Sequence, residues 1–596
     1  MLLRAVTRNA STYFPTMASD RPVCSYESKC YRRNPEHFKQ VDHPHLDNLL
    51  VGSVEDKPVT IPETLSFECN NRNLLNEQLE ILRKIAAEKY KAASSRETKS
   101  RLASSRATES RPSLREGESS AASGRNENPQ IVDLTGDDGN ARPARKSVRE
   151  MLIKHGQAPD YLPKAGKFLV KYEMSQPYNI FFTAVQKEKD TWKQKLSVTF
   201  AEILDRSLGE IVSSLHLTFV VDVGWLCLQY LLAEQKANMD VFCNERADDD
   251  PVRPTINIQN VKSPYNFGSH HSKMSILHYK DNGVRIIISS ANLYEQDWDL
   301  RTQGLWISPH LPRLPASARD QDGESITGFK EDLLRYFSEY KQDTSKWRSI
   351  LCRTDFSSVK VAFVSSVPSL YHSSNESSRW GHRRLAKILG AHAELPDGDP
   401  CPTIVATASS IGSLGTSYNA WLSTDLVASM TKAENQTGRP TPAFKLIYPS
   451  VENYKRSFDL AEGSCCLSYH ALGHAKQKWI CEHMHHWVAT RSNRSRAMPH
   501  IKTFLRLSAD ERKVPWLVLG STNVSKAAWG YVDRGSYKIL NYEAGVVFLP
   551  KFFNGGTYFP VNKADSTPDL PTLPIPFNIP LTPYSKTDEP FLVLAS

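Results

Sequence analysis

The pattern of hydrophobic and polar positions changes near residue 165. From about Phe168 onwards, short apolar runs alternate with amphipathic segments. Residues 283–289 and 516–520 are apolar runs that predict buried strands, whereas residues 329–340 have the spacing of a helix. Alternation of these two kinds of segment is typical of layered α/β folds. We therefore predict an α/β body over residues 166–596, with the Pro-rich last 30 residues wrapped on its surface.

The chain before residue 165 has a different composition. Residues 94–123 contain ten serines and no aromatic residue, so this segment cannot bury enough apolar surface to offset its ordering entropy. Upstream, Leu75, Leu79, Leu82 and Ala86 recur at helical spacing. We predict that residues 49–165 are a mostly disordered linker with a helix near residues 73–91.

Residues 1–20 carry Arg4 and Arg8 and no acid before Asp20, which is the composition of a mitochondrial transit segment. A disordered N-terminus is the simpler alternative. The most apolar long stretch, residues 215–233, contains Asp222 and is predicted to be buried structure rather than a membrane span. We expect no membrane partner.

A search for internal repeats finds two segments with one pattern. In the first, His271-x-Lys273 precedes an apolar run, and Asn282-Gly283 predicts a hairpin turn. A second apolar run follows the turn and leads to Asn292. His270 and His278, which flank this motif, are expected to be structural neighbours.

The second copy consists of His500-x-Lys502, an apolar run, a polar loop and another apolar run that leads to Asn523. In a strand, residues two positions apart point to one face, so each motif would present an imidazole and an ammonium together. Two such motifs that face one phosphorus suit an in-line displacement, with one histidine attacking and the other protonating the leaving oxygen. One motif alone would usually be a surface pair, whereas two matched copies favour catalysis.

Composition and charge constrain the chemistry less. The chain has 596 residues and a formal charge of +9, which is compatible with nucleic acid, anionic lipid or neither. Ten scattered cysteines favour a reducing compartment over a disulfide framework. The predicted core shows no carboxylate cluster suited to a divalent metal, so we predict metal-independent phosphoryl transfer without a catalytic cofactor.

Near the N-terminus, Cys24-x5-Cys30-x6-His37-x5-His43 is a Cys2His2 set. Thiolates and imidazoles are the ligands of tetrahedral zinc, and we predict a structural zinc finger over residues 21–48.

The two His-x-Lys motifs resemble the phospholipase D superfamily. The superfamily's usual Asp, five positions after each Lys, is replaced here by His278 and Leu507. That departure is similar to the tyrosyl-DNA phosphodiesterase branch. The resemblance continues through residues 267–274, 302–306, 409–415, 447–453, 497–503, 523–530 and 542–545.

This resemblance implies two similar α-β-α halves, residues 166–355 and 356–596, related by a pseudo-twofold axis. It implies hydrolysis of the 3′-phosphotyrosyl bond between DNA and a topoisomerase I peptide, and of other 3′ blocks, through a phosphohistidine. His271 would be the nucleophile and His500 the general acid and base, while Gln303 and Glu543 would orient the two imidazoles. The implied catalytic residues are His271, Lys273, Asn292, Gln303, His500, Lys502, Asn523 and Glu543.

The same resemblance implies a groove for single-stranded DNA, in which Phe267 would stack on a base and the other residues would contact the backbone. For each serine a plain loop or cap role is an equal alternative. The implied DNA-binding residues are Phe267, Ser410, Ser413, Lys476, Ser525 and Ala527.

The finger resembles the poly(ADP-ribose)-binding zinc finger of DNA repair proteins, which implies that Tyr26, Tyr31 and Arg32 bind ADP-ribose. Glu27 stands where that family usually has glycine, and the glycine usual after His-Pro is also absent.

Residues 131–138 resemble a SUMO-interaction motif, with Ile131, Val132 and Leu134 as the strand that pairs with SUMO. A solvated linker is the alternative. Arg142, Arg145, Lys146 and Arg149 are the loose basic cluster of a nuclear import signal or of plain linker.

The leading hypothesis is a nuclear DNA repair phosphodiesterase, with a mitochondrial pool left open. A lipid-cleaving phospholipase D and an inactive poly(ADP-ribose) reader are the competing classes.

Overall fold

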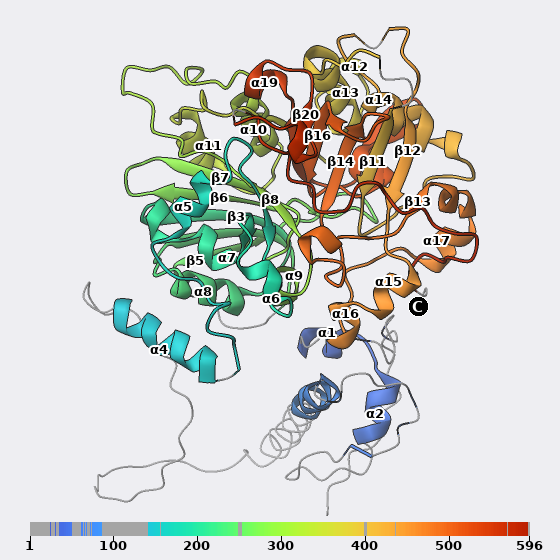
Figure 1. Cartoon of the computed structure of the whole chain (residues 1–596). Coiled ribbons are helices and arrows are strands. Elements are labelled where there is room, and N and C mark those ends of the chain that lie inside the picture. Colours follow the sequence, from blue (N-terminus) through green and yellow to red (C-terminus); the bar gives the residue numbers. More distant parts are fainter. Residues whose placement is uncertain are drawn as a thin grey trace, which may run out of the picture. The chain divides into compact units, whose positions relative to one another are not determined.

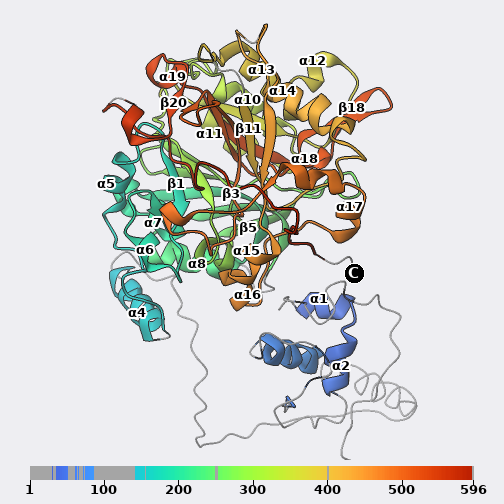
Figure 2. The same ribbon diagram turned by 45° about the vertical axis from the view of Figure 1, so that its right-hand side comes forward.

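The computed structural model (Figures 1 and 2) describes residues 24, 30, 35–50, 61–62, 65, 67, 72, 74–85, 141–154, 156–247, 253–398, 402–435, 437–568 and 570–593. The chain divides into two compact units, residues 1–146 and 147–596. In the described residues no helix is long and apolar enough to cross a membrane. The predicted transit segment (1–20) and the predicted SUMO motif (131–138) lie outside the described residues.

The first unit contains α1 (Pro35–Gln40), α2 (Pro44–Leu50) and a helix over residues 74–85. Leu75, Leu79 and Leu82 of that helix are buried in a small core with Phe38 and Leu46. The helix predicted from the spacing of the leucines is therefore present, and the structure adds the core in which it is buried.

Residues 141–165 differ from the predicted linker. They contain α4 (Ala141–Lys154), and the following segment is part of the second unit, where Tyr161 and Leu162 are buried. The Tyr161 hydroxyl donates to Asp299 Oδ1 at 2.6 Å and to the Ala184 carbonyl at 3.2 Å. The buried Tyr161 ring and the two hydrogen bonds of its hydroxyl attach this short segment to the rest of the unit. The polar composition of the segment does not indicate this attachment.

The first half of the second unit is built on a sheet of eight strands in the order β2-β1-β8-β7-β6-β3-β4-β5. Its strands are β1 (Ile180–Thr183), β2 (Ser197–Val198), β3 (Ile211–Val221), β4 (Asn238–Arg246), β5 (Ile256–Asn260), β6 (Met274–Tyr279), β7 (Val284–Ser289) and β8 (Gly304–Ile307). Its helices are α5 (Phe168–Glu173), α6 (Lys189–Trp192), α7 (Phe200–Ile203), α8 (Val223–Leu232), α9 (Glu295–Asp299), α10 (Phe329–Ser338) and α11 (Ser345–Cys352).

The second half is built on a sheet of seven strands in the order β13-β12-β11-β14-β16-β19-β9. The strands of this sheet are β9 (Ala362–Ser366), β11 (Thr403–Thr407), β12 (Ala443–Ile447), β13 (Met484–His485), β14 (Lys502–Leu507), β16 (Trp516–Gly520) and β19 (Glu543–Phe548). Two small sheets contain β10 (Ser369–Tyr371), β17 (Tyr531–Asp533) and β18 (Ser536–Ile539), and β15 (Lys513–Val514) and β20 (Phe559–Pro560). The helices are α12 (Ser374–Ser377), α13 (Gly381–His392), α14 (Ala428–Met430), α15 (Val451–Lys455), α16 (Phe458–Ala461), α17 (Ala471–Ala475), α18 (Lys526–Trp529) and α19 (Lys551–Asn554).

The two large sheets share one strand order. The run β5-β4-β3-β6-β7-β8-β1 matches β13-β12-β11-β14-β16-β19-β9 strand by strand. In both runs the first two pairings are parallel and the next four are antiparallel. The repeat seen in the sequence is therefore a repeat of topology, while the predicted pseudo-twofold axis stays a prediction.

Alternation along the strands explains how the first sheet is buried on both faces. In β7, Ile286 and Ile288 belong to the large core shared with the second half, whereas Ile287 belongs to the core that α7 and α8 cover. The helices α5, α7 and α8 lie on that second face (Figure 1). The predicted turn is present, since Asn282 adopts φ 64° between β6 and β7.

The two sheets meet through neighbouring strands: β8 packs against β16, and β7 against β19. A Cβ added at Gly304 would lie 2.4 Å from Ile501 Cδ1, so a larger residue there would displace the Ile501 side chain where the halves meet. The C-terminal segment lies along the second half, where Tyr584 N donates to the Met484 carbonyl at 3.0 Å.

Candidate active site

His271, the first of the paired histidines, lies just before β6 rather than within it, so the strand-face argument does not describe its placement. Its Nδ1 lies 2.9 Å from Glu543 Oε2, at the start of β19 in the second half. Glu543 also accepts hydrogen bonds from Ser521 Oγ and from Asn541 Nδ2. A carboxylate held in this way fixes the proton on Nδ1 and leaves Nε2 as the ring nitrogen with a free electron pair.

His500 is placed in a similar way with the halves exchanged. It lies just before β14, and its Nδ1 is 2.9 Å from Gln303 Nε2 and 3.1 Å from Gln303 Oε1. Gln303 immediately precedes β8 in the first half, and Ser290 Oγ donates to its Oε1 at 2.8 Å. Each histidine is thus oriented by a residue of the other half.

The backbone repeats this exchange. His271 N donates to the Tyr542 carbonyl at 3.0 Å, and His500 N donates to the Thr302 carbonyl at 3.1 Å. Tyr542 and Thr302 directly precede Glu543 and Gln303. Because β19 and β8 occupy equivalent positions in the two sheets, Glu543 and Gln303 also occupy equivalent positions. Extending the repeat search to these two strands could have found both residues.

The two lysines are buried, and each turns back on its own motif. Lys273 Nζ donates to the His271 carbonyl at 2.8 Å, and Lys502 Nζ donates to the His500 carbonyl. Burial lowers the pKa of Lys273 to about 8 and, together with the charge of Lys273, lowers that of Lys502. The two ammonium groups are buried and repel each other, so the charge of a bound anion would relieve both costs.

Burial also lowers the pKa values of the two histidines. Burial lowers the pKa of His271, with Glu543 opposing and Lys273 adding to the effect. Burial also lowers the pKa of His500, and there Asp297 opposes while Lys502 adds to it. A neutral imidazole has a free electron pair on one ring nitrogen, so these shifts favour the form that can act as a nucleophile or a base.

The two predicted asparagines differ in their contacts. Asn523 Oδ1 accepts from Ser409 N and Ser410 N, both at 3.1 Å, which fixes its amide nitrogen as a donor. Asn292 Nδ2 instead donates to Asp297 Oδ2 at 2.8 Å, and the buried Asn292 Oδ1 has no partner in the described residues. One of the two Asn292 amide hydrogens is therefore already used within the protein.

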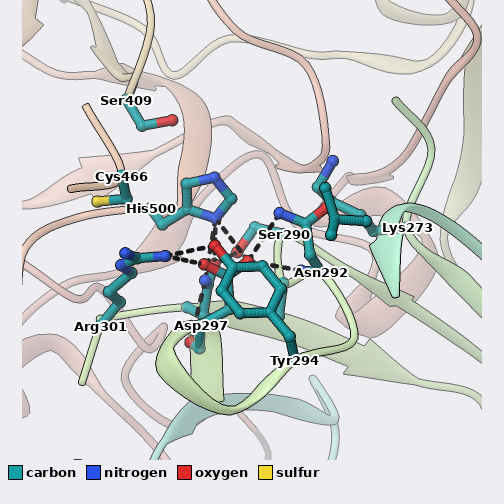
Figure 3. A network of polar contacts seen from close by, with 12 residues as sticks. Lys273, Ser290, Asn292, Tyr294, Asp297, Arg301, Ser409, Cys466 and His500 are labelled. Atoms are coloured by element: carbon teal, nitrogen blue, oxygen red, sulfur yellow. Dashed lines mark hydrogen bonds and ion pairs between the residues drawn. The ribbon is translucent and has the colours of Figure 1, made fainter. Parts of the chain in front are cut away.

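A buried chain of charges behind His500 was not found from the sequence (Figure 3). Asp297, on α9, pairs with Arg301, which pairs in turn with Asp459 of the second half at 2.9 Å. Asp297 Oδ2 lies 3.5 Å from His500 Nδ1. Arg301 and Asp459 are 158 residues apart along the chain, and Asp297 and His500 are further apart still, so no local spacing indicates these partners.

The predicted DNA-binding residues lie on the surface or just beneath it. Phe267 is 98% exposed and has φ 63°, so its ring is held out from the body. Ser410 is partly buried, Ser413 and Lys476 are exposed, and Ala527 is partly buried. Ser525 accepts from Ala528 N at 3.2 Å and caps α18, which is the alternative role weighed for it.

In the first unit the predicted zinc ligands converge. Ligand atoms of Cys24, Cys30, His37 and His43 all lie within 4.8 Å of one another. His37 Nε2 is 3.3 Å from both sulfur atoms and 3.2 Å from His43 Nε2. Two sulfurs and two imidazole nitrogens gathered around one point fit a structural zinc ion. Tyr26, Tyr31 and Arg32 lie outside the described residues.

Known proteins share these features. A family model described as tyrosyl-DNA phosphodiesterase matches residues 179–585, and one described as PBZ domain matches residues 21–46. The chain is 38% identical to tyrosyl-DNA phosphodiesterase 1 of Drosophila melanogaster over 96% of this chain and 99% of the relative. It is 31% identical to a probable tyrosyl-DNA phosphodiesterase of Caenorhabditis elegans, over 70% of this chain and 89% of the relative.

A solved structure also resembles the fold. The crystal structure of the yeast tyrosyl-DNA phosphodiesterase matches with a TM-score of 0.53 at 17% identity, over 70% of this chain and 99% of that one. The repeated sheets and the two paired histidines define an enzyme with the phospholipase D-like fold. The chain belongs to the tyrosyl-DNA phosphodiesterase family and carries an N-terminal PBZ zinc finger.

Proposed function

We propose that this enzyme hydrolyses the phosphodiester between a DNA 3′ end and the tyrosine of a topoisomerase I peptide, and also removes other 3′ blocks. The cross-paired histidines carry the proposal, because each Nδ1 is engaged by the opposite half and each Nε2 is left for chemistry. The relatives' names supply the substrate class.

The reaction has two steps. In the first, His271 Nε2 forms a bond to phosphorus, the bond to the tyrosyl oxygen breaks, and His500 Nε2 gives that oxygen its proton. In the second, His500 takes a proton from water, whose oxygen attacks phosphorus and displaces His271. A DNA 3′-phosphate and a tyrosyl peptide are the products. A phenol is a better leaving group than an alkyl alcohol, so an imidazolium is a sufficient acid.

The lysines would take the place of a metal ion. Lys273 and Lys502 bring two positive charges to the phosphate oxygens, and Asn523 adds a neutral donor fixed by Ser409 and Ser410. We therefore propose catalysis without a metal cofactor.

This proposal predicts full activity in EDTA. The test incubates the protein with a 3′-phosphotyrosyl oligonucleotide and, separately, with phosphatidylcholine, each with and without chelator, and measures released tyrosine and choline. We expect tyrosine release at the same rate, within about 2-fold, in both conditions. Cleavage of lipid alone would assign the site to lipid headgroups, and loss of tyrosine release in EDTA would contradict the metal-free mechanism.

For the finger we propose binding of poly(ADP-ribose), which would direct the enzyme to DNA breaks. Cys30→Ser should abolish zinc content and polymer binding, because the metal holds α1, α2 and the cysteines together. Metal analysis and fluorescence anisotropy with labelled polymer measure the two effects, and Cys481→Ser, outside the finger, is the control. Retained polymer binding without zinc would overturn the prediction.

Two further assignments remain proposals from the sequence alone: SUMO binding through Ile131, Val132 and Leu134, and action in the nucleus, with a mitochondrial pool as the alternative.

A further inference from the structure

A fully buried carboxylate faces the general acid of the proposed reaction. Asp297 is 0% exposed, and its Oδ2 lies 3.5 Å from His500 Nδ1, the same nitrogen that Gln303 contacts (Figure 3). Two donors from Asn292, the backbone N at 2.7 Å and the side-chain Nδ2 at 2.8 Å, hold that oxygen in place. The carboxylate is therefore fixed beside the imidazole rather than free to turn away.

Arg301 fixes the other end of this carboxylate. Its guanidinium pairs with Asp297 Oδ1 and, at 2.9 Å, with Asp459 Oδ1 on α16 of the second half. Tyr294 accepts a further hydrogen bond from Arg301 Nη1 at 2.6 Å. Burial would raise the pKa of Asp297, but His500 and Arg301 outweigh burial and hold it below its ordinary value. Asp297 is accordingly ionised while it faces His500.

Gln303 alone cannot favour the charged imidazole. Its amide presents a donor, Nε2, and an acceptor, Oε1, at similar distances from His500 Nδ1. It can therefore accommodate that nitrogen with or without a proton. A carboxylate at the same nitrogen favours the protonated form, because it attracts the imidazolium charge.

The charged groups around the two histidines also affect where a proton is held. His271 has one carboxylate near it, Glu543, and two lysines, Lys273 and Lys502. His500 has one carboxylate, Asp297, and three cations, which are Lys502, Lys273 and Arg301. Cys466, next to Asp459 and Lys502, is a thiol whose pKa burial raises, so it adds no charge. A bound phosphodiester adds one negative charge beside the histidines, which favours the uptake of a proton there. The proposed reaction needs that proton on His500, and Asp297 is the carboxylate that favours it there.

We infer that Asp297 is the positioning residue that keeps His500 protonated while the diester is bound, so that diester binding is linked to uptake of the proton later given to the leaving oxygen. This inference rests on the proposed function.

The first test compares leaving groups in Asp297→Asn. A 3′-phosphotyrosyl oligonucleotide needs an acid, whereas its 3′-(4-nitrophenyl) analogue leaves as a stable anion and needs little help. We expect the ratio of the tyrosyl rate to the nitrophenyl rate to fall by at least about 10-fold in the variant. Since protonated His500 is the active form, activity is lost as pH rises through its pKa. Removal of the carboxylate lowers that pKa, so the alkaline limb should move to lower pH.

The control is Tyr294→Phe, which removes a hydroxyl from Arg301 but leaves every carboxylate in place. It should keep the wild-type ratio and alkaline limb. An Asp297→Asn variant that loses both substrates equally, or neither, would overturn the inference. Failure of the wild type on both substrates would instead overturn the proposed function.

A second measurement does not need Asp297→Asn to fold. His271→Ala should bind the 3′-phosphotyrosyl oligonucleotide without cleaving it. Calorimetric titration in buffers of different ionisation enthalpy then measures the protons taken up on binding. We expect about one proton at a pH above the pKa of free His500. Binding with no uptake across pH 6–9 would overturn the inference.

Discussion

His271→Ala should abolish release of tyrosine from a 3′-phosphotyrosyl oligonucleotide, with a loss on the order of 10⁴-fold or more. The alanine variant has no nitrogen to form the bond to phosphorus, and no other imidazole is oriented by Glu543 in the described residues. Single-turnover rates measured with a labelled oligonucleotide give the size of the loss.

His278→Gln is the matched control for that experiment. His278 lies on β6 and its Nδ1 contacts Ser213 Oγ at 3.2 Å, away from Glu543. This variant should retain activity within about 3-fold, as expected of a partly buried residue outside the site. Substantial tyrosine release by His271→Ala would remove this histidine from the nucleophilic role.

His500→Ala should slow turnover by roughly 10²- to 10⁴-fold and should let a covalent adduct persist. The variant lacks the acid for the tyrosyl oxygen and the base for water, but it retains His271 and both lysines. The second step suffers because water is a poor nucleophile without a base. Neutral denaturing gels should show the oligonucleotide attached to the protein, and acid should release it, because a phosphohistidine bond is acid-labile.

His271→Ala/His500→Ala supplies the control for that adduct. The double variant should form none, because the atom that carries the oligonucleotide is absent. An adduct in the double variant would place the covalent bond on another residue. Fast turnover by His500→Ala would mean that the leaving group needs no acid.

The sequence predicted the family and the pairing of the two motifs better than the geometry of the site. The duplicated His-x-Lys motifs and the Asn282-Gly283 turn are local patterns, which can be recognised from the sequence alone. The strand-face argument was wrong in detail, since His271 and His500 precede their strands and the lysines turn back to the carbonyls of those histidines. The end of a strand is set by bridges to distant segments, such as those to Tyr542 and Thr302.

The charged groups behind His500 could not be predicted from the sequence. Asp297, Arg301 and Asp459 are ordinary charged residues with ordinary neighbours, and only folding brings Arg301 between two carboxylates. Gln303 and Glu543 were reached through the family resemblance alone, although their places in β8 and β19 match. The polar composition of the segment around Tyr161 likewise did not indicate that it is ordered, because the burial of a single aromatic ring has little effect on average composition.

The exchange of orienting residues between the halves has a consequence for how such a site can change. Two identical protomers around a twofold axis would complete each other's histidine in the same reciprocal way, but every substitution would then occur twice. Joining the halves in one chain removes that restriction. Here one imidazole faces a carboxylate at 2.9 Å, and the other faces an amide at 2.9 Å with a carboxylate behind it at 3.5 Å. A division of labour between nucleophile and acid can therefore arise from single changes in the opposite half, with both histidines left untouched.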